Sequence, residues 1–340
     1  MRRILVIPGD GIGPEVTASA VKVLESLGLP LSFEEAEAGF ACYRRHGTSL
    51  PESTIQKAKA SDAVLFGAVT TPPGIEGYAS AILGLRRSLG LFANVRPVRS
   101  FPHPASRQGI DMVIVRENTE GLYAGRERVS EDGNTAVSER VITREASLRI
   151  ARFAYALAES QGRRKVTIVH KANVLRKSCG LFRESALEVA RDHPSIETDE
   201  ALVDSTAMRL IQRPEAFYII LTTNLFGDIL SDEASMLVGG LGVAPSANIG
   251  EKYALFEPVH GSAPDISGRG IANPFAAVLS AAMMLDWLGF TAEAKAVGHA
   301  VERALSQGNT TMDLGGSLTT AQAADALITL IREGAPEERA

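Results

Sequence analysis

The 340-residue chain is predicted to fold as an α/β protein. Short apolar runs, with the length of buried strands, alternate with segments of helical period over most of the sequence. Several of these runs end directly in polar clusters, and parallel α/β sheets bind ligands beyond the carboxyl ends of their strands. The pattern therefore indicates an enzyme.

The polar clusters contain side chains suited to an acidic substrate and a metal ion. They are Gly67-Ala68-Val69-Thr70 after AVLF, Arg116-Glu117-Asn118 after MVIV, His170-Lys171-Ala172-Asn173 after VTIV, Asp204 after ALV, and Thr222-Thr223-Asn224 after YIIL. Arginine and lysine bind carboxylates, whereas carboxylate oxygens bind hard cations.

Composition narrows the class of protein. Hydrophobic residues make up 45% of the chain and charged residues 22%, as in ordinary globular proteins, and the net charge of −5 gives no general attraction to nucleic acid or anionic membranes. The longest apolar stretch, Phe275 to Leu285, is shorter than the roughly 20 residues of a membrane span. Because Arg2-Arg3 leads straight into a β-like run without the apolar region of a signal peptide, a cytoplasmic location is expected.

The first half of the chain shows its elements most clearly. A strand is expected at Ile4 to Ile7, followed by a glycine-rich turn and a helix from about Pro14 to Leu27, since proline suits a first helical turn. A second strand at Ala63 to Phe66 leads through a Pro/Gly-rich loop to a helix from about Ser80 to Leu89. Two further expectations are an exposed arm or hairpin at Glu127 to Asn134 and a frayed tail at Pro336 to Ala340.

Two breaks in the pattern suggest two domains. Pro97 to Pro104 contains three prolines, and the stretch from Gly239 to Gly250 is rich in glycine. We therefore expect a discontinuous first domain of residues 1–98 and 250–340, and a second domain of residues 99–249.

The glycine-rich turn Gly9-Asp10-Gly11-Ile12-Gly13 is not a Rossmann fingerprint. Proline occupies position 14, where that fingerprint requires glycine, and no acidic residue ends a second strand at the right distance. The Gly-Lys-Ser/Thr of a phosphate-binding P-loop is also missing. The sequence leaves open whether this turn contacts a ligand or only connects a strand to a helix.

Asp228 and Asp232 are candidate metal ligands. They lie four residues apart in Leu225 to Leu237, a segment of helical period, so both carboxylates face one side of the helix. Like charges at this spacing are unfavourable unless a cation lies between them. With Asp204 they supply hard oxygen ligands suited to Mg²⁺ or Mn²⁺. Apolar neighbours indicate a largely buried segment: Ile229, Leu230, Ala234 and Met236.

Five further residues are candidates for substrate binding or catalysis. Guanidinium groups bind carboxylates bidentately, which favours Arg86, Arg96 and Arg116. Lys171 follows an apolar strand and is either a general base or a member of a structural ion pair. Tyr123 is either a buried phenolic acid or a packed aromatic residue.

The cysteine and histidine residues suggest no metal site. Cys42 and Cys179 have neither the spacing of a disulfide framework nor that of a zinc site, and each is expected to be a small buried hydrophobic residue. The six histidines show no ligand spacing either.

With these motifs in place, the chain resembles the metal-dependent β-decarboxylating dehydrogenases of 2-hydroxy acids, namely the isocitrate, 3-isopropylmalate and homoisocitrate dehydrogenases. The resemblance spans essentially the whole chain in order. It is carried by Gly9–Gly13, Leu85-Arg86, Asn94–Pro97, Val115–Tyr123, His170–Val174, Thr222–Asp232, His260–Asp265, Ile271–Pro274 and Asp313–Gly316.

The resemblance implies an isopropylmalate dehydrogenase-like fold, with two α/β domains around a large mixed sheet and a non-Rossmann dinucleotide site in the first domain. It also implies a homodimer or tetramer with the active site in a cleft between domains, where Lys171 and Asp204 reach into the partner subunit's site. The substrate would be a tricarboxylate or substituted malate. Its malate core would contact Arg86, Arg96 and Arg116, with Asn173 also in the substrate site, and the metal would bind Asp204, Asp228 and Asp232.

The family resemblance also implies a mechanism. Lys171, through a water molecule or Asp204, would remove the proton of the 2-hydroxyl, and Tyr123 would protonate C3 after CO₂ leaves. A non-catalytic regulatory subunit of this family is disfavoured, because the lysine, the tyrosine and all three aspartates are present. A phosphoryl-transfer enzyme is disfavoured because the P-loop lysine is missing.

NAD is the cofactor that the resemblance implies. NADP enzymes of the family carry a lysine and a tyrosine after His-Gly-x-Ala-Pro, whereas this chain carries Asp265 and Ile266. A carboxylate there accepts hydrogen bonds from ribose hydroxyls and repels the 2′-phosphate. His260 and Asn273 would flank the adenine; the remaining expected contacts are Thr70, Gly261 and Ala263.

The substrate is predicted from the residues that precede Arg86. Ser80 followed by Ile82 resembles homoisocitrate dehydrogenases of lysine biosynthesis, whereas isopropylmalate enzymes carry a glutamate where this chain has Ala79. Some homoisocitrate enzymes carry an arginine at the position of Leu83, and the leucine makes the pocket more apolar. We therefore expect homoisocitrate first, with 3-isopropylmalate, isocitrate or broad specificity as alternatives.

Overall fold

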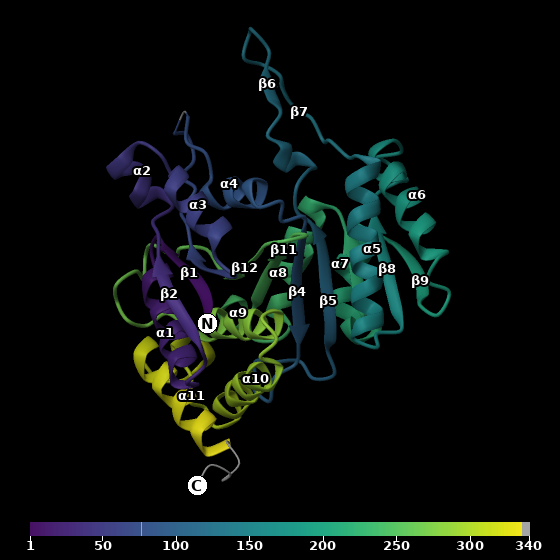
Figure 1. Cartoon of the computed structure of the whole chain (residues 1–340). Coiled ribbons are helices and arrows are strands. Elements are labelled where there is room, and N and C mark those ends of the chain that lie inside the picture. Colours follow the sequence, from purple (N-terminus) through teal and green to yellow (C-terminus); the bar gives the residue numbers. More distant parts are fainter. Residues whose placement is uncertain (76, 335–340) are drawn as a thin grey trace. The chain divides into compact units, whose positions relative to one another are not determined.

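The computed structural model describes residues 1–75 and 77–334 and divides into two compact units. Unit 1 comprises Met1–Leu91, Ser100–Gln108 and Ser235–Ala340, and unit 2 comprises Phe92–Arg99 and Gly109–Ala234. Each unit combines helices with a mixed sheet, so the predicted α/β class is confirmed (Figure 1). The tail at Pro336 to Ala340 lies outside the described residues.

The unit borders differ from the expected domain borders at three segments: residues 92–98 fall in unit 2, and residues 100–108 and 235–249 fall in unit 1. Strand β4 (Ala93–Arg99) belongs to unit 2 because it pairs antiparallel with β5 (Asp111–Glu117) along its whole length, with Pro97 opposite Val113. Residues 235–249 belong to unit 1, where β11 (Pro245–Ile249) pairs with β12 (Ala254–Pro258). The proline-rich and glycine-rich breaks in the sequence thus overlap paired strands.

The sheet of unit 1 follows the order β2-β1-β3-β12-β11. Neighbouring strands run parallel except for the antiparallel pair β11–β12. The other strands are β1 (Arg2–Gly9), β2 (Leu31–Glu35) and β3 (Ala63–Ala68). β3 is buried along its entire length, which explains its continuous apolar sequence.

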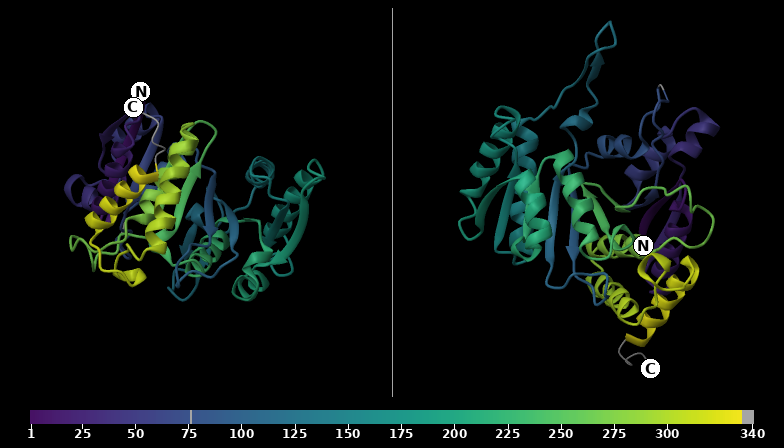
Figure 2. Two further views of the ribbon diagram at one scale, coloured as in Figure 1. Left: turned by 90° about the horizontal axis from the view of Figure 1, so that it is seen from below. Right: turned by 180° about the vertical axis from the view of Figure 1, so that it is seen from behind.

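Helices of unit 1 pack against its sheet and against one another. α1 (Gly13–Ser26) carries Pro14 in its first turn and buries Val16, Ala20 and Val23, a helical period that faces β1 and β3. α9 (Phe275–Trp287) packs on β11 and β12, and α10 and α11 pack against each other in the C-terminal part of the chain (Figure 2). The remaining bounds are α2 (Phe40–His46), α3 (Glu52–Ala60), α4 (Ala81–Ser88), η3 (Leu241–Val243), α10 (Thr291–Ser306), η4 (Met312–Leu314) and α11 (Thr320–Gly334).

The sheet of unit 2 follows the order β4-β5-β10-β8-β9, and all pairs except β4–β5 are parallel. Its further strands are β8 (Lys165–His170), β9 (Glu197–Leu202) and β10 (Ile219–Thr222). β6 (Glu127–Val129) and β7 (Ala136–Ser138) form a separate antiparallel hairpin that projects from this unit (Figure 1). The hairpin is exposed, as the sequence predicted.

Helices α5 (Arg144–Ser160), α6 (Ser178–Ala190) and α7 (Val203–Gln212) pack on the sheet of unit 2. α8 (Asn224–Met236) follows β10, and η1 (Leu122–Ala124) and η2 (Pro214–Ala216) are short 3₁₀ turns. The expectation that α8 is largely buried was wrong for its outer face: Leu230 and Ala234 are buried, but Ile229 and Met236 are 56% and 67% exposed. In the described part of the chain, no helix is both long and apolar enough to cross a bilayer.

Asp10 joins three segments of unit 1. Its carboxylate accepts hydrogen bonds from the backbone N–H groups of Phe40 (2.7 Å), Ala41 (2.8 Å) and Thr70 (2.9 Å). The first two belong to the first turn of α2, whose N-cap residue is Gly39 and has no side chain to cap the helix. Asp10 therefore caps α2 from the loop that follows β1.

Replacing Asp10 by alanine leaves these three N–H groups without their charged acceptor. We expect the free energy of unfolding to fall by about 3 kcal/mol, because hydrogen bonds to charged groups contribute about 1.5–3 kcal/mol each and are partly replaced by water here. Urea unfolding at fixed protein concentration, followed by fluorescence of Trp287 in α9, measures the change. Asp325→Ala is the control, since the Lys22–Asp325 ion pair is exposed and contributes at most about 1 kcal/mol. Equal losses in the two variants would contradict the role of Asp10.

Candidate active site

The carboxyl ends of the parallel strands in unit 2 bring several predicted residues to one edge of its sheet. β5 ends with Arg116 and Glu117, β10 with Thr222, and β8 with His170, directly before Lys171. Asp204 was expected directly after a strand. Strand β9 instead ends at Leu202, so Asp204 is the second residue of α7. The parallel topology thus gives the clustering that the sequence pattern predicted.

Arg116 is the largest fully buried side chain in the described structure. Its Nε and one terminal nitrogen donate to Asn224 Oδ1 at 3.0 and 2.7 Å, and its other terminal nitrogen donates to Asp228. Both partners belong to α8, four residues apart on one helix face. The buried cation is therefore neutralised and oriented by a single helix.

Arg96 lies on the same face of the β4–β5 pair as Arg116, on the diagonal position. It donates to Asn94 Oδ1 at 2.7 Å and to Ser231 Oγ at 2.6 Å. It also contacts the two α8 carboxylates, at 3.3 Å to Asp228 and 3.2 Å to Asp232. Two guanidinium groups and two carboxylates thus form one charged cluster.

Tyr123 joins this cluster through its hydroxyl group. The hydroxyl donates to Asp228 Oδ2 at 2.5 Å, and the Arg116 guanidinium carbon lies 5.1 Å from the centre of the phenol ring. Burial, followed by the hydrogen bond to the Asp228 carboxylate, raises the pKa of Tyr123 above its usual value of 10. The phenol is therefore protonated at neutral pH, as a proton donor must be.

The carboxylates of Asp228 and Asp232 fit a divalent cation. Their side chains are 33% and 56% exposed, and both carboxylates lie on one face of α8 beside Arg96. Hard oxygen donors of this kind suit Mg²⁺ or Mn²⁺. Among the described residues, Asp204 does not join them in a group of ligand atoms within 4.8 Å of one another. Two of the three predicted metal ligands are thus together in one chain.

Asp204 instead pairs with Lys171. Lys171 Nζ lies 2.6 Å from Asp204 Oδ2, and this hydrogen bond lowers the pKa of Asp204 below its usual value. The backbone N–H of Lys171 donates to Cys179 Sγ at 3.3 Å, which fixes the start of the segment between β8 and α6. Asn173, two residues further along the turn, is exposed.

A chain of polar contacts behind Lys171 was not predicted from the sequence. The N–H of Ala172 donates to His170 Nδ1 at 3.1 Å, so the ring proton is assigned to Nε2, which lies 3.3 Å from Glu200 Oε2. Arg183 holds the same carboxylate at 2.8 Å. The backbone of Ala172, directly after Lys171, is therefore held by His170, whose ring contacts the carboxylate that also binds Arg183. The contact between His170 and Glu200 depends on the pairing of β8 with β9, which the sequence did not show.

In unit 1, the four predicted substrate residues around α4 differ in burial. Ser80 is the N-cap residue of α4, Ile82 packs against the core of the unit, Leu83 is partly exposed, and Arg86 is buried. Leu83 and Arg86 are three residues apart and share a helix face. Leu83 is therefore the apolar residue of this set that is not part of the core cluster.

Arg86 is held by residues that the sequence did not indicate. Its terminal nitrogen donates to Glu257 Oε1 at 3.0 Å, and Asn248 Nδ2 donates to the same oxygen at 2.8 Å. The Nε of Arg86 is buried and has no hydrogen-bond partner within the described residues. A buried donor without a partner is costly, and it fits a site for a carboxylate oxygen.

The glycine-rich turn of unit 1 contacts the loop after β12. The N–H of Ile12 donates to Ser262 O at 2.9 Å, and a Cβ on Gly11 would lie 1.9 Å from that oxygen. Thr70 Oγ1 lies 2.7 Å from Ser262 Oγ. The turn therefore has a structural role, since it brings predicted cofactor residue Thr70 against the 260–266 loop.

The 260–266 loop has features that fit a nucleotide. His260 Nε2 is buried and has no partner among the described residues, and burial lowers the pKa of this histidine below its usual 6.5. A Cβ on Gly261 would meet open space, and Ala263 has a φ of 36°, a strained value for alanine. Asp265 is exposed and Ile266 partly buried. The open space at Gly261 leaves room for a ligand against this loop, and the place of His260 beside an adenine stays a prediction.

The nitrogen and the oxygen of the Asn273 side-chain amide each form a hydrogen bond within the protein. Its Nδ2 donates to Asp313 Oδ2 at 3.0 Å, and its Oδ1 accepts from the N–H of Phe275 at 3.0 Å, at the start of α9. One N–H of the amide and one lone pair of its oxygen remain for a ligand. Asp313, which holds this orientation, was not among the predicted site residues.

The environment of His170 predicts a pH dependence of stability. Burial lowers the pKa of His170 below 6.5, although Glu200 favours the charged form and Arg183 opposes it. The unfolded chain therefore binds this proton more readily, so the contribution is complete above 6.5 and stability is lost as the pH falls below it. In urea unfolding at about pH 7.5 and about pH 5, wild type should lose more stability than His170→Gln. Parallel losses in the two proteins would contradict this assignment.

Comparison with known proteins places the chain in one family. Residues 3–327 match the family described as isocitrate/isopropylmalate dehydrogenase. The isocitrate/homoisocitrate dehydrogenase of Thermus thermophilus is 54% identical over 331 residues, covering 97% of this chain and 98% of its own. The 3-isopropylmalate dehydrogenase of Archaeoglobus fulgidus is 50% identical over 332 residues, covering 97% and 100%. The crystal structure of isocitrate dehydrogenase from Methylococcus capsulatus matches with a TM-score of 0.95 at 44% identity, covering 98% of this chain and 100% of that chain. The chain thus belongs to the isocitrate/isopropylmalate dehydrogenase family and is an oxidative decarboxylating dehydrogenase.

Proposed function

We propose that the enzyme converts homoisocitrate to 2-oxoadipate and CO₂, with NAD as hydride acceptor and Mg²⁺ or Mn²⁺ as the metal. The observation that carries the proposal is the cluster of Arg96, Arg116, Tyr123, Asp228 and Asp232 in unit 2. It combines carboxylate-binding cations, hard metal ligands and a protonated phenol. A metal-dependent oxidative decarboxylation of a 2-hydroxy acid uses all three.

The arginines are assigned to the carboxylates of the substrate. Arg96 and Arg116 are each held by neutral partners as well as by α8 carboxylates, so their planes are oriented before a ligand binds. Arg86 is held by Glu257 and keeps a buried N–H without a partner in the described structure. Preorganised guanidinium groups of this kind lose little side-chain entropy when a carboxylate binds.

Lys171 and Tyr123 are assigned to the two proton transfers. Lys171, in the partner subunit's site and acting through a water molecule or the Asp204 carboxylate that lies 2.6 Å from its Nζ, is assigned to removal of the 2-hydroxyl proton while hydride passes from C2 to NAD. Asp228 and Asp232 would hold the cation, which would supply polarisation of the 2-hydroxyl and stabilisation of the charge that develops as the carboxyl group on C3 leaves as CO₂. The Tyr123 hydroxyl, kept protonated by its environment, then gives its proton to C3.

NAD is favoured over NADP by the residues at the end of the 260–266 loop. Asp265 is exposed there, and its charge suits ribose hydroxyls and disfavours a 2′-phosphate. His260, Gly261, Ala263 and Asn273 are assigned to the nucleotide, with Thr70 in contact with the same loop.

Homoisocitrate is favoured by Ser80, which lies at the start of α4, and a relative named isocitrate/homoisocitrate dehydrogenase is 54% identical. A second candidate is 3-isopropylmalate. It is favoured by the apolar, partly exposed Leu83 and by a 50% identical relative named for that substrate.

Association of copies of the chain is supported by exposed apolar residues on two helices of unit 2. Met208 and Ile211 on α7 are 62% and 59% exposed, and Ile229 on α8 is 56% exposed. Large exposed apolar side chains are typical of protein interfaces. We propose that α7 and α8 form the contact of a homodimer or tetramer.

The primary test measures NADH formation by the purified enzyme with Mg²⁺ and compares kcat/KM for homoisocitrate, isocitrate and 3-isopropylmalate. We expect the highest value with homoisocitrate. A preference for 3-isopropylmalate would assign the choice to Leu83 and contradict the role given to Ser80. Absence of NAD reduction with all three acids would contradict the proposed reaction.

Leu83→Arg should move the preference away from 3-isopropylmalate and toward the two acids that carry a third carboxylate. One new charge-assisted hydrogen bond contributes about 1.5–3 kcal/mol, so the ratio of kcat/KM values should change by about tenfold or more. Leu83→Met, which conserves volume and adds no charge, is the matched control. An unchanged ratio in Leu83→Arg would remove Leu83 from the explanation of specificity.

Asp265→Lys combined with Ile266→Tyr should raise the ratio of kcat/KM for NADP to that for NAD by about tenfold or more, because a repulsive charge is replaced by a phosphate-binding one. The measurement uses saturating substrate and varies each dinucleotide. Asp265→Asn alone, which removes the repulsion but adds no cation, should give a smaller increase. If the double variant keeps the wild-type ratio, the 2′-hydroxyl of the ribose does not lie beside Asp265.

A further inference from the structure

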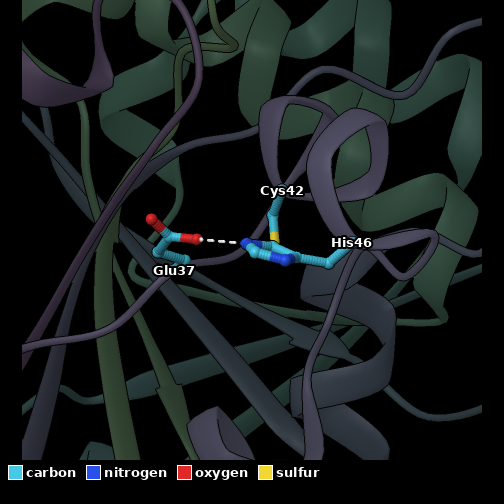
Figure 3. A group of neighbouring side chains, drawn as sticks. All are labelled: Glu37, Cys42 and His46. Atoms are coloured by element: carbon cyan, nitrogen blue, oxygen red, sulfur yellow. Dashed lines mark hydrogen bonds and ion pairs between the residues drawn. The ribbon is translucent and has the colours of Figure 1, made fainter.

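Three side chains of different chemistry meet beside α2 in unit 1. They are Glu37, from the segment between β2 and α2, and Cys42 and His46, which lie four residues apart on α2 (Figure 3). Their ligand atoms all lie within 4.8 Å of one another, and His46 Nε2 is 3.1 Å from Glu37 Oε2. The family reaction uses none of them.

We propose that Glu37, Cys42 and His46 form a binding site for one Zn²⁺ ion. Sulfur, imidazole nitrogen and carboxylate oxygen are all zinc ligands, with metal–ligand distances of about 2.0–2.3 Å. Tetrahedral bonds of this length place ligand atoms about 3.5 Å apart, so only small side-chain movements are needed. The set of donors differs from the all-carboxylate set on α8, because a thiolate does not suit Mg²⁺.

The burial of the three ligands fits such a site. Cys42 is 1% exposed and fixed in the helix, whereas the side chains of His46 and Glu37 are 52% and 49% exposed and can adjust. Zn²⁺ can therefore enter from the solvent side, where water supplies the fourth ligand. Glu37 binds Arg45 through Oε1 at 2.8 Å and faces His46 through Oε2, so the two contacts use different oxygens.

Zinc binding must release the protons now held at the site. Coordination requires the Cys42 thiolate, so the thiol proton must leave when zinc binds. The imidazole must also present a lone pair where it now contacts Glu37. The affinity for zinc should therefore rise with pH.

The site would fasten a short helix to the preceding chain. α2 has only seven residues, and its first turn is capped by Asp10. A metal bound by Cys42 and His46 would fix the rest of α2 to Glu37. Tyr43 of α2 packs against Tyr78 with ring centres 5.1 Å apart, and Tyr78 donates to Thr70 O at 2.8 Å. Stabilisation of α2 would thus extend to the loop that precedes α4.

Co²⁺ titration of the metal-free, full-length protein tests the proposal, because thiolate bound to Co²⁺ gives a near-ultraviolet charge-transfer absorption that oxygen ligands do not give. We expect one equivalent of Co²⁺ to produce this absorption and Zn²⁺ to abolish it by displacement. Zn²⁺ should also raise the Tm of wild type, since a ligand that binds only the folded state stabilises it.

Variants separate this site from the others. Cys42→Ser should lose the thiolate absorption, whereas Cys179→Ser and Asp232→Asn should keep it. His46→Gln changes a half-exposed residue and should weaken Zn²⁺ binding more than about tenfold, since loss of even an outer-shell partner costs about 10–100-fold.

Absence of the absorption in wild type, or its persistence in Cys42→Ser, would overturn the proposal. Equal Zn²⁺ affinity in wild type and His46→Gln would do the same, even if Cys42→Ser failed to fold. The readouts are spectroscopic and thermal, so they do not depend on the substrate or cofactor of the enzyme.

Discussion

The pairing of the buried Arg116 guanidinium with α8 is the interaction on which the rest of the unit 2 site depends. Arg116 is 1% exposed, and a buried cation costs several kcal/mol unless a counter-charge and hydrogen bonds compensate for lost water. Asn224 and Asp228 supply both from one helix. This approach requires glycine at position 227, because a Cβ there would lie 2.6 Å from Arg116 Cγ. The position of α8 against β5 is therefore set by the charge of Arg116 and by the lack of a side chain at Gly227.

The same arrangement explains how one carboxylate can serve two purposes. Asp228 neutralises Arg116 and Arg96 and accepts the Tyr123 hydrogen bond, yet it is also a proposed metal ligand. With Asp232, the two arginines and two aspartates sum to zero charge. The proposed divalent cation and the doubly charged malate core of the proposed substrate also sum to zero, so the site would gain no net charge when both bind. Either one alone would leave two unit charges uncompensated, which favours binding them together.

The sequence predicted what depends on local pattern, and it missed what depends on distant partners. The α/β class and the helix of Asp228 and Asp232 follow from periodicity, and the exposed arm or hairpin predicted at Glu127 to Asn134 follows from its polar, glycine-containing sequence; all three were found. β11 was missed because its sequence contains polar residues, among them the fully buried Asn248. Asn248 donates to Glu257, which also binds Arg86, 171 residues earlier in the chain than Glu257. The outer face of α8 is apolar and exposed, so hydrophobicity alone gave the wrong burial. The sequence did not indicate Cys42 and His46 as a pair of metal ligands, because α2 is too short to show a helical period and Glu37 lies outside it.

In the proposed reaction, specificity for the substituent on C3 of the substrate should depend on very few atoms around α4. Ile82 packs into the core of unit 1, so a change there alters folding and substrate contacts together. Leu83 is partly exposed and shares a helix face with Arg86, and Ser80 is the residue at the start of α4 that offers a hydroxyl. An apolar side chain distinguishes an isopropyl group from a smaller one by only about 1–3 kcal/mol. A distal carboxylate instead requires a hydrogen-bond donor or water, because an unpaired charge against leucine is costly. Under the proposed assignment, the choice between homoisocitrate and 3-isopropylmalate would therefore depend on whether Ser80 and water can solvate that carboxylate better than Leu83 excludes it.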